Sequence, residues 1–386
     1  MLNFKDLNYR KSFFKDKFFK NNNSKKIGVL GIILIFGSIC FVNTPAISNA
    51  SASQSVLNIA KGGTNANSAE SAQINLGRTD SISSNSTDNQ FPSSKAVYDY
   101  INLQFPEFAA LDTSGNYIYS HDGLTWSEPK QIANGPSRWL TATYGGGQFI
   151  AAGSTGKITT SKDGITWTEA VTVPGAESIS LESIAFGNNY FLVSGNGIIA
   201  RCLITTDCSI SGNWSVVFSG RTYGPRYIAF GNGRFWASWE ANFLSTNNGE
   251  SWTMYGWPSG TGWSSTIFYA LGYFWTDGDN SLAKCPEGST TWINTGFFTD
   301  INGWTSGSTD GNQTIVMSRP NIIAYSKDSG NSFTTINVSD TEIYQLAYKN
   351  GFFWGITNNK ILYSSDGITW QSKALPSGTW LALAVK

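Results

Sequence analysis

The chain has 386 residues, and its 26 basic and 26 acidic side chains give no net charge at pH 7. The first 26 residues hold 8 of the basic and 2 of the acidic residues, which leaves 18 basic and 24 acidic residues and a net charge of −6 beyond them. This excess of acid argues against nucleic-acid binding, which needs a basic patch, and against binding acidic membranes through charge. Charged residues are only 13% and aromatic residues 14% of the chain, a composition typical of exported β-proteins.

The N-terminus has the layout of a secretory signal peptide. The basic region 1–26 is followed by an uncharged apolar run at 27–42 and then by small residues around 48–52 that match an A-x-A-like cleavage site. We therefore predict a signal peptide over residues 1–52 and a secreted or cell-surface protein. The alternative is an uncleaved N-terminal membrane anchor, although 16 apolar residues are few for a span of about 20.

Residues 53–107 differ from the rest of the chain, because they are rich in Ser, Asn and Ala and contain no Trp. Residues 68–76 and 94–103 are each long enough for a short capped helix, and the polar stretch 79–90 is typical of a linker. Two pieces, 60–77 and 93–102, resemble elements of phage tail fibres. The segment is thus either a flexible stalk or a fibre-like segment for oligomerisation or attachment.

A short motif then recurs along the chain, best seen at residues 364–370 (S-S-D-G-I-T-W). Near copies and degenerate copies follow one another every 38 to 44 residues, and such a period indicates a repeat architecture. The acidic or amide position of the motif is occupied by Asp122, Asp163, Asp207, Asn247, Glu287, Asp328 and Asp366. The aromatic position is occupied by Trp126, Trp167, Trp214, Trp252, Trp292, Phe333 and Trp370.

The motif predicts a tight turn between two strands, since Asp or Asn can bond nearby backbone N–H groups and Gly accepts a positive φ. Upstream of it, residues 183–193, 227–237 and 345–355 each show two apolar strands around a Gly/Asn turn. One repeat therefore supplies four antiparallel strands, which is a propeller blade. We assign these acidic and aromatic residues to the scaffold.

The two ends of the repeat region complement each other. Residues 108–112 offer one strand before the first motif, and residues 379–386 form a surplus strand that matches residues 138–144. The expected fold class is therefore all-β: a seven-bladed β-propeller over residues 108–386, with four-stranded antiparallel blades and a first blade shared between both chain ends. Closing the ring in this way removes open sheet edges.

The motif resembles the Asp-box, or BNR, repeat of sialidases, sortilin-type receptors and photosystem II assembly factors. The resemblance covers roughly residues 108–386. In that family the repeat lies on the turn between the third and fourth strands of a blade, remote from any catalytic centre. Because the family includes both enzymes and binding proteins, the resemblance implies a fold more specifically than an activity.

The sequence offers little for catalysis. Its single histidine, His121, lies in an exposed turn, which argues against Ser–His or Cys–His chemistry. The Arg-Ile-Pro element of sialidases is absent before the first motif, and nothing pairs Tyr223 with Glu240 as a nucleophile. No cofactor or metal site is expected. Cys202 and Cys208 either form a small disulfide or remain thiols. Cys285 is a thiol in both cases.

The blade connections on the rim opposite the motif turns are rich in Trp, Tyr and Arg, and rings with guanidinium groups suit sugars. We therefore predict an exported, non-enzymatic binding or adhesion propeller whose partner is a glycan or a cell-surface protein; the alternative is a sialidase-like glycoside hydrolase. The competing account of the rings is that they pack between blades. The candidate ligand-binding residues are Arg138, Trp139, Arg221, Tyr223, Arg226, Trp263, Trp304 and Trp380.

Overall fold

The chain divides into two compact units, residues 1–100 and 101–386. The computed structural model describes residues 105–386, apart from 221–223, 257–263, 279–280, 299–302 and 339–341, and the backbone of four strands before them. In the first unit, β1 (Leu30–Ile35) pairs antiparallel with β2 (Ser38–Asn43), and β3 (Arg78–Thr79) pairs parallel with β4 (Phe91–Pro92). The expected cleavage site and short helices lie outside the described residues. None of the described segments is a helix long and apolar enough to cross a membrane.

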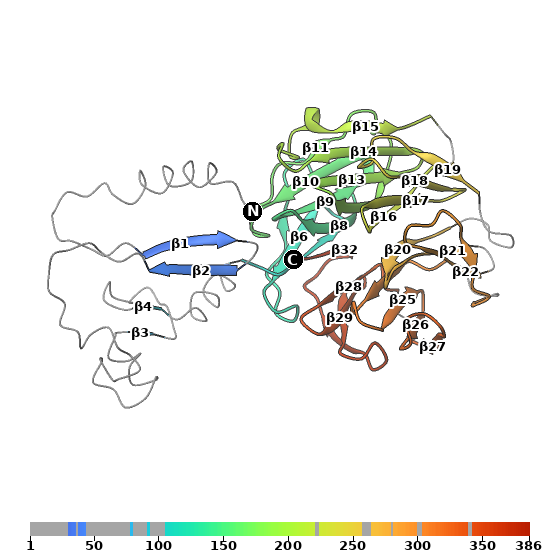
Figure 1. Ribbon diagram of the computed structural model, residues 1–386. Helices are drawn as coiled ribbons and strands as arrows, with labels where there is room; N and C mark the ends of the chain where they lie inside the picture. Colours follow the sequence, from blue (N-terminus) through green and yellow to red (C-terminus); the bar gives the residue numbers. More distant parts are fainter. Residues whose placement is uncertain are drawn as a thin grey trace, which may run out of the picture. The chain divides into compact units, whose positions relative to one another are not determined.

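The second unit is a seven-bladed propeller of four-stranded antiparallel sheets, as the repeats predict (Figure 1). The innermost strands are β32 (Trp380–Val385), β8 (Trp139–Gly145), β12 (Leu181–Gly187), β16 (Tyr227–Gly231), β20 (Ile267–Ala270), β24 (Ser306–Thr309) and β28 (Gln345–Lys349). The second strands are β5 (Phe108–Asp112), β9 (Gln148–Gly153), β13 (Tyr190–Gly195), β17 (Arg234–Ser238), β21 (Tyr273–Gly278), β25 (Ile315–Arg319) and β29 (Phe352–Ile356).

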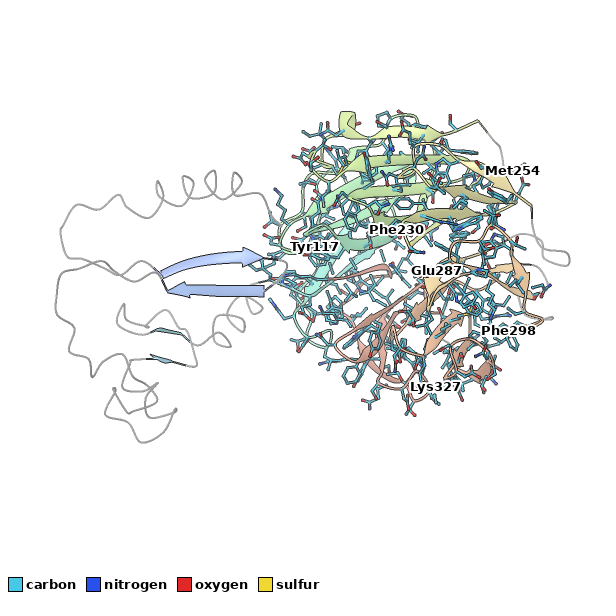
Figure 2. All side chains as sticks on the ribbon, viewed as in Figure 1. Tyr117, Phe230, Met254, Glu287, Phe298 and Lys327 are labelled. Carbon is cyan, nitrogen blue, oxygen red and sulfur yellow. A yellow bond between two sulfur atoms is a disulfide. The ribbon has the colours of Figure 1, made fainter. Side chains whose placement is uncertain are left out.

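The outer half of each blade is the hairpin that carries the motif. The third strands are β6 (Asn116–Ser120), β10 (Lys157–Ser161), β14 (Ile198–Leu203), β18 (Asn242–Ser245), β22 (Ser281–Pro286), β26 (Ile322–Ser326) and β30 (Lys360–Ser364). The outermost strands are β7 (Lys130–Gln131), β11 (Val171–Thr172), β15 (Ser215–Phe218), β19 (Thr253–Tyr255), β23 (Ile293–Asn294), β27 (Thr334–Asn337) and β31 (Gln371–Ala374). Figure 2 places Phe230, on an innermost strand, near the middle of the ring and Met254, on β19, at its periphery.

Both chain ends build the first blade, as expected from the sequence. The C-terminal strand β32 pairs antiparallel with β5, with Leu383 opposite Ala110 and Val385 opposite Phe108. Gln345 of the seventh blade secures this strand, because its side-chain oxygen accepts the Leu383 N–H at 3.1 Å while its amide nitrogen donates to the Ala142 carbonyl of the second blade at 2.8 Å. The closure is therefore non-covalent and links three blades.

A repeated pair of residues forms the core of every blade. A large apolar residue at or near the start of the second strand, Phe in six blades and Ile315 in the sixth, is fully or almost fully buried and pairs with a small residue near the end of the third strand. In five blades that small residue is serine, which also caps the motif turn. Cysteine stands there in the other two blades: Cys202 pairs with Phe191, and Cys285 pairs with Phe274.

The regular motif turns are closed by a side-chain network. In the second blade the Asp163 carboxylate accepts the N–H groups of residues 165 and 166 at 2.8 and 2.7 Å and the Ser161 hydroxyl at 3.0 Å. The Gly164 N–H donates to Ser161 Oγ at 2.8 Å, and the Trp167 indole donates to the Gly164 carbonyl at 3.3 Å. Gly164 has φ +73°, a conformation that favours glycine. The scaffold assignment of this aspartate follows from these bonds.

The two degenerate turns depart from this pattern. In the third blade Cys202 stands in the serine position and forms a disulfide with Cys208. Asp207 lies five residues beyond that position rather than two, and its carboxylate accepts hydrogen bonds from Ser209 within its own loop. In the fifth blade the Glu287 carboxylate accepts the Tyr269 hydroxyl instead of turn N–H groups. The motif alignment was thus correct in period at these two positions, but neither carboxylate has the expected role.

The motif aromatics also differ in burial. Trp214 and Trp292 are buried at 3% and 7% exposure, whereas Trp126, Trp167, Trp252, Phe333 and Trp370 are only half-buried. The half-buried rings pack against the buried cores but stay partly exposed, so their removal would cost less than that of a fully buried Trp.

Candidate functional site

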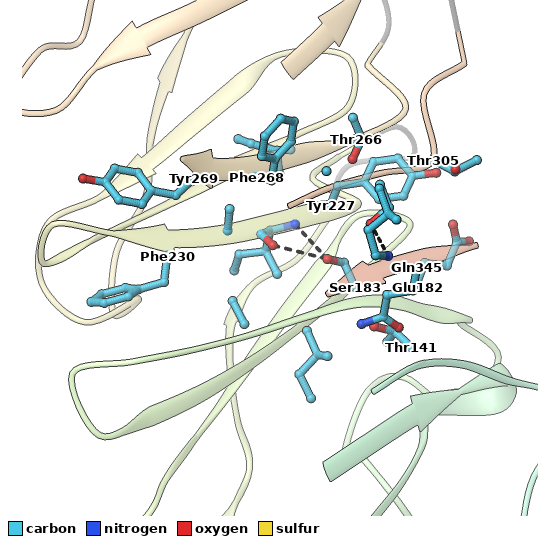
Figure 3. A pocket seen from close by; sticks show the side chains of 18 of the residues that line it. Thr141, Glu182, Ser183, Tyr227, Phe230, Thr266, Phe268, Tyr269, Thr305 and Gln345 are labelled. Atoms are coloured by element: carbon cyan, nitrogen blue, oxygen red, sulfur yellow. Dashed lines mark hydrogen bonds between the residues drawn. The ribbon is translucent and has the colours of Figure 1, made fainter. Parts of the chain in front are cut away.

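The innermost strands enclose a central cavity of about 320 Å³. Residues on or next to β8, β12, β16, β20, β24 and β28 line it, so six of the seven blades contribute to one site (Figure 3). This volume is at the lower end of the range of about 300–1,000 Å³ found for small-molecule sites. The cavity therefore has room for a small ligand or for the end of a longer one.

One end of the cavity is polar. Equivalent positions on the innermost strands, fixed by their pairing with the second strands, form what we term the polar layer. It consists of Thr141, Ser183, Tyr227, Thr266, Ser306 and Gln345, with Ala382 as the equivalent residue on β32. Residues from six repeats, about forty positions apart in the sequence, thus share one level of the cavity.

Three members of the polar layer bond to the free backbone edge of a neighbouring blade. Ser183 Oγ accepts the Ile228 N–H at 3.1 Å, and Ser306 Oγ accepts the Leu346 N–H at 2.9 Å. Gln345 bonds to the first and second blades as described above. Unpaired edge groups of an innermost strand need such partners when they are away from water.

Two other members remain unengaged. Thr141 and Thr266 are 7% and 5% exposed and line the cavity, and neither hydroxyl has a hydrogen-bond partner within the described part of the chain. A hydroxyl is both donor and acceptor, and a buried one gains most from a partner. These two hydroxyls are therefore available to a ligand in the cavity.

The other end of the cavity is aromatic, as Figure 3 shows for Phe230 and Tyr269. Each of these rings packs on the core aromatic of its own blade, with centroids 4.7 Å apart for Phe230 and Phe235 and 5.0 Å for Tyr269 and Phe274. A Cβ at Gly231 would lie 2.2 Å from the Tyr269 ring, so glycine is required where the neighbouring ring passes.

The aromatic end belongs to the face that carries the motif turns. Antiparallel pairing brings the turn between the first two strands of a blade to the same face as the motif turn. Asn188, in the first kind of turn, donates to the side chain of Asn248, in the motif turn of the next blade, at 2.9 Å. The polar layer lies toward the opposite face, where the innermost strands begin.

An ion pair stands beside the polar layer. Arg226 donates to both oxygens of Glu182 through Nε and, at 2.6 Å, Nη2. The guanidinium also lies 4.5 Å from the Trp239 ring centroid, a cation–π distance. Burial alone would lower the pKa of Arg226, but the hydrogen bonds and charge of Glu182 raise it. Burial raises the pKa of neighbouring Tyr227 to about 12, so this phenol stays protonated.

A buried carboxylate positions one of the free hydroxyls. Asp277 is 1% exposed and accepts the N–H groups of Ser265 at 2.8 Å, Thr266 at 2.9 Å and Trp304 at 3.1 Å. Burial raises the pKa of Asp277, opposed by these donors. The carboxylate joins the entry of the fifth blade to that of the sixth and thereby fixes the backbone of Thr266 at the cavity wall.

The structure corrects three of the eight predicted ligand-binding residues. Trp139, Trp304 and Trp380 have 0% exposure, because each stands at or just before the start of an innermost strand and its ring packs between blades. These rings cannot stack on a ligand, so the competing account of packing is the right one for them. Arg138 is exposed, and Arg226 is engaged by Glu182. Arg221, Tyr223 and Trp263 lie outside the described residues.

The polar layer was not predicted from the sequence, although a signal for it was present. The repeated hairpin pattern begins with a polar residue in S-I-A-F-G at 183–187, Y-I-A-F-G at 227–231 and Q-L-A-Y-K at 345–349. A polar residue recurring at the start of otherwise apolar inner strands indicates a shared polar level in a ring. Only the ring geometry shows that these residues face one cavity.

The chain matches no protein-family model and no curated protein. Among solved structures, a chain of the nidogen/laminin complex has 9% identity and a TM-score of 0.46, over 62% of this chain and 98% of that one. YCF48 from Cyanidioschyzon merolae has 16% identity and a TM-score of 0.48, over 62% and 86% of the two chains. YCF48 bound to D1 peptide has 18% identity and a TM-score of 0.47, over 62% and 84%. At these levels the likenesses carry no argument about function.

Proposed function

We propose that this protein is an exported, non-catalytic binding propeller that recognises a glycan through the polar end of its central cavity. The observation that carries the proposal is the polar layer, and above all the unengaged hydroxyls of Thr141 and Thr266, which line the same cavity as the Glu182 carboxylate. Sugars present several hydroxyls that each donate and accept, so they match a ring of hydroxyl, amide and carboxylate groups. A cavity of about 320 Å³ suits one sugar residue at the end of a chain.

A binding role is favoured over glycoside hydrolysis by the acids at the cavity. Hydrolysis of the usual kind needs two carboxyl groups flanking the scissile bond. Among the described residues that line the cavity, Glu182 is the one carboxylate, and Arg226 occupies both of its oxygens. A second acid that would serve as nucleophile or proton donor is not among those lining residues.

Export and membership of the Asp-box type are further parts of the proposal. Export is supported by the signal-peptide pattern of residues 1–52 and by the Cys202–Cys208 disulfide, which is typical of oxidising compartments. The Asp-box type is supported by the turn network around Asp122, Asp163 and Asp366, in which one carboxylate oxygen accepts two successive backbone N–H groups.

The test is a glycan array probed with the full chain and with two hydroxyl-deletion variants, Thr141→Val and Thr266→Val. We expect the wild-type chain to bind a defined set of glycans and each variant to bind them roughly fivefold more weakly, the equivalent of one hydrogen bond of about 1 kcal/mol. Thr335→Val, on the exposed face of β27, is the matched control and should bind like wild type. Absence of binding to every glycan, or equal losses in all three variants, would contradict the proposal.

A further inference from the structure

Glu182 is directed at the cavity by an irregularity in its strand. The pairing of β12 with β13 shifts register between Leu181 and Ser183, which leaves Glu182 as the extra residue of a bulge. Bulges commonly re-aim one side chain, and Glu182 lines the central cavity next to Thr141 and Ser183 (Figure 3). The carboxylate is therefore part of the surface that a ligand would meet.

Arg226 pairs with Glu182 but is not among the residues that line the cavity, although its side chain is 30% exposed and that of Glu182 is 19% exposed. Its backbone is fixed by the bond from its N–H to the Ser238 carbonyl at 3.0 Å and by the Ser194 hydroxyl, which donates to its carbonyl at 2.8 Å. Its guanidinium is held between Glu182 and the Trp239 ring. Arg226 thus offsets part of the Glu182 charge, but of the two partners only Glu182 lines the cavity, so a ligand there would meet its carboxylate.

We propose that Glu182 makes the cavity selective for uncharged, hydroxyl-rich sugars and rejects acidic ones, an inference that rests on the proposed glycan function. Each carboxylate oxygen has about two acceptor sites, and the bidentate arginine uses one on each, so acceptor capacity remains for ligand hydroxyls. An anionic group in the same place would face a carboxylate, and juxtaposed like charges weaken binding. Arginine, the residue best suited to a ligand carboxylate, is already occupied.

The test compares sugars of one shape that differ in charge. The probes are the methyl glycosides of glucose, galactose and mannose, each with its matching uronic acid and the uncharged amide of that acid, titrated against the full wild-type chain. We expect the neutral glycosides and the amides to bind and the uronates to bind roughly tenfold more weakly or worse, since about 1.4 kcal/mol is a factor of ten. This comparison requires no variant.

Glu182→Gln then tests the residue itself. It leaves Arg226 without its anionic partner, so the variant should gain uronate binding at least tenfold while its preference for the neutral sugar falls. The matched control is Glu250→Gln, which removes the same charge from an exposed side chain of a motif turn, paired with Arg201, and should leave the wild-type preference unchanged. Thermal melting of each variant establishes that it is folded.

The possible outcomes separate this inference from the proposed function. If no neutral sugar and no uronate binds, both fail together. If neutral sugars and uronates bind equally, or if uronates bind better through the exposed Arg138 near the rim, glycan binding stands and the role of Glu182 is wrong. A folded Glu182→Gln chain that keeps the wild-type preference also overturns the inference, even when the wild-type selectivity is as expected.

Discussion

The carboxylate of Asp366 illustrates how a single side chain closes a motif turn. It accepts the backbone N–H groups of Ile368 and Thr369, both at 2.8 Å, and the Ser364 hydroxyl at 2.9 Å. Partial burial acts to raise its pKa, but the hydrogen bonds from Thr369 and Ile368 outweigh it and lower the pKa from 3.8 to about 2. A carboxyl group with a lowered pKa stabilises the folded state above its ordinary pKa and loses that effect as the pH falls.

Asp366→Ala should therefore lower the free energy of unfolding by about 1 kcal/mol at neutral pH, and the difference from wild type should shrink as the pH falls from about 4 to about 2. The measurement is chemical unfolding at a series of pH values, with Glu128→Gln as control, because the Glu128 carboxylate is exposed and accepts no hydrogen bond from the described residues. A difference that stays constant down to pH 2 would show that this carboxylate does not stabilise the turn.

The role of single residues was predictable only where local chemistry decides it. The hydrogen bonding of the aspartates in the regular turns was predictable, because Asp-Gly within seven residues fixes a local network. Trp139 and Trp380 were assigned wrongly, since a Trp two residues after Ser or Gly at a strand start has the same local sequence whether its ring points to solvent or between blades. Burial of those rings depends on the neighbouring blade, about forty residues away.

The third blade shows how one element can replace its turn network by a covalent link. The loop between Cys202 and Cys208 lacks the serine–aspartate pair, yet the Trp214 indole still donates to the carbonyl of Cys208 at 2.9 Å, as Trp126 does to that of Gly123. Ile204 in this loop packs against the core shared with the second blade. We infer that the disulfide closes this loop, as the hydrogen bonds of serine and aspartate close the regular motif turns.

Reduction should consequently weaken the propeller. For a loop of this size, loss of the cross-link costs about 2 kcal/mol by the chain-entropy estimate, so the melting temperature of the wild-type chain should fall in reductant. The double variant Cys202→Ser, Cys208→Ser should melt at the lower temperature with or without reductant. Cys285→Ala removes the buried free thiol and should keep the wild-type response to reductant; an unchanged melting temperature of the reduced wild-type chain would contradict the inference.

Blade boundaries followed from the period, but the pairing inside the degenerate blades did not. The period of 38 to 44 residues tolerates an insertion, and the longer loop of the third blade moves Asp207 away from the turn position although its spacing to neighbouring motifs is nearly regular. Strand register is set by which residue faces the core, here Cys202 against Phe191. Aligning the motif copies on their acidic residue cannot find this register, because cysteine replaces the serine that precedes the turn.

The ring as a whole was predictable because both chain ends carry complementary half-blades. The cavity was not, since its polar layer is assembled from one residue per repeat and has no local motif. The ligand-binding residues were predicted in the blade connections because those loops are rich in Trp, Tyr and Arg. The structure instead brings together polar residues on the innermost strands. The residues that line the axis come from different repeats, about forty positions apart, so no short sequence pattern contains two of them.

Closure by β32 leads to the last prediction, which concerns the stability of the entire propeller. Deleting residues 379–386 removes the pairing of β32 with β5, exposes the edge of β5 and leaves the Gln345 side chain without the Leu383 N–H. It also removes the Lys386 carbonyl that Lys349 Nζ contacts at 2.7 Å and the Lys386 N–H that donates to the Glu107 carbonyl at 2.8 Å.

Because the first blade is shared by both ends, we expect the truncated chain to melt at a much lower temperature and over a broader range than the full chain. Leu383→Ala is the graded comparison: its side chain is 1% exposed, so its loss should cost roughly 2–5 kcal/mol and lower the melting temperature while the transition stays cooperative. Circular dichroism melts of the three chains provide the measurement. Were the truncated chain to melt like the full one, the seventh and second blades would have to be held together without β32, and the closure described above would not stabilise the ring.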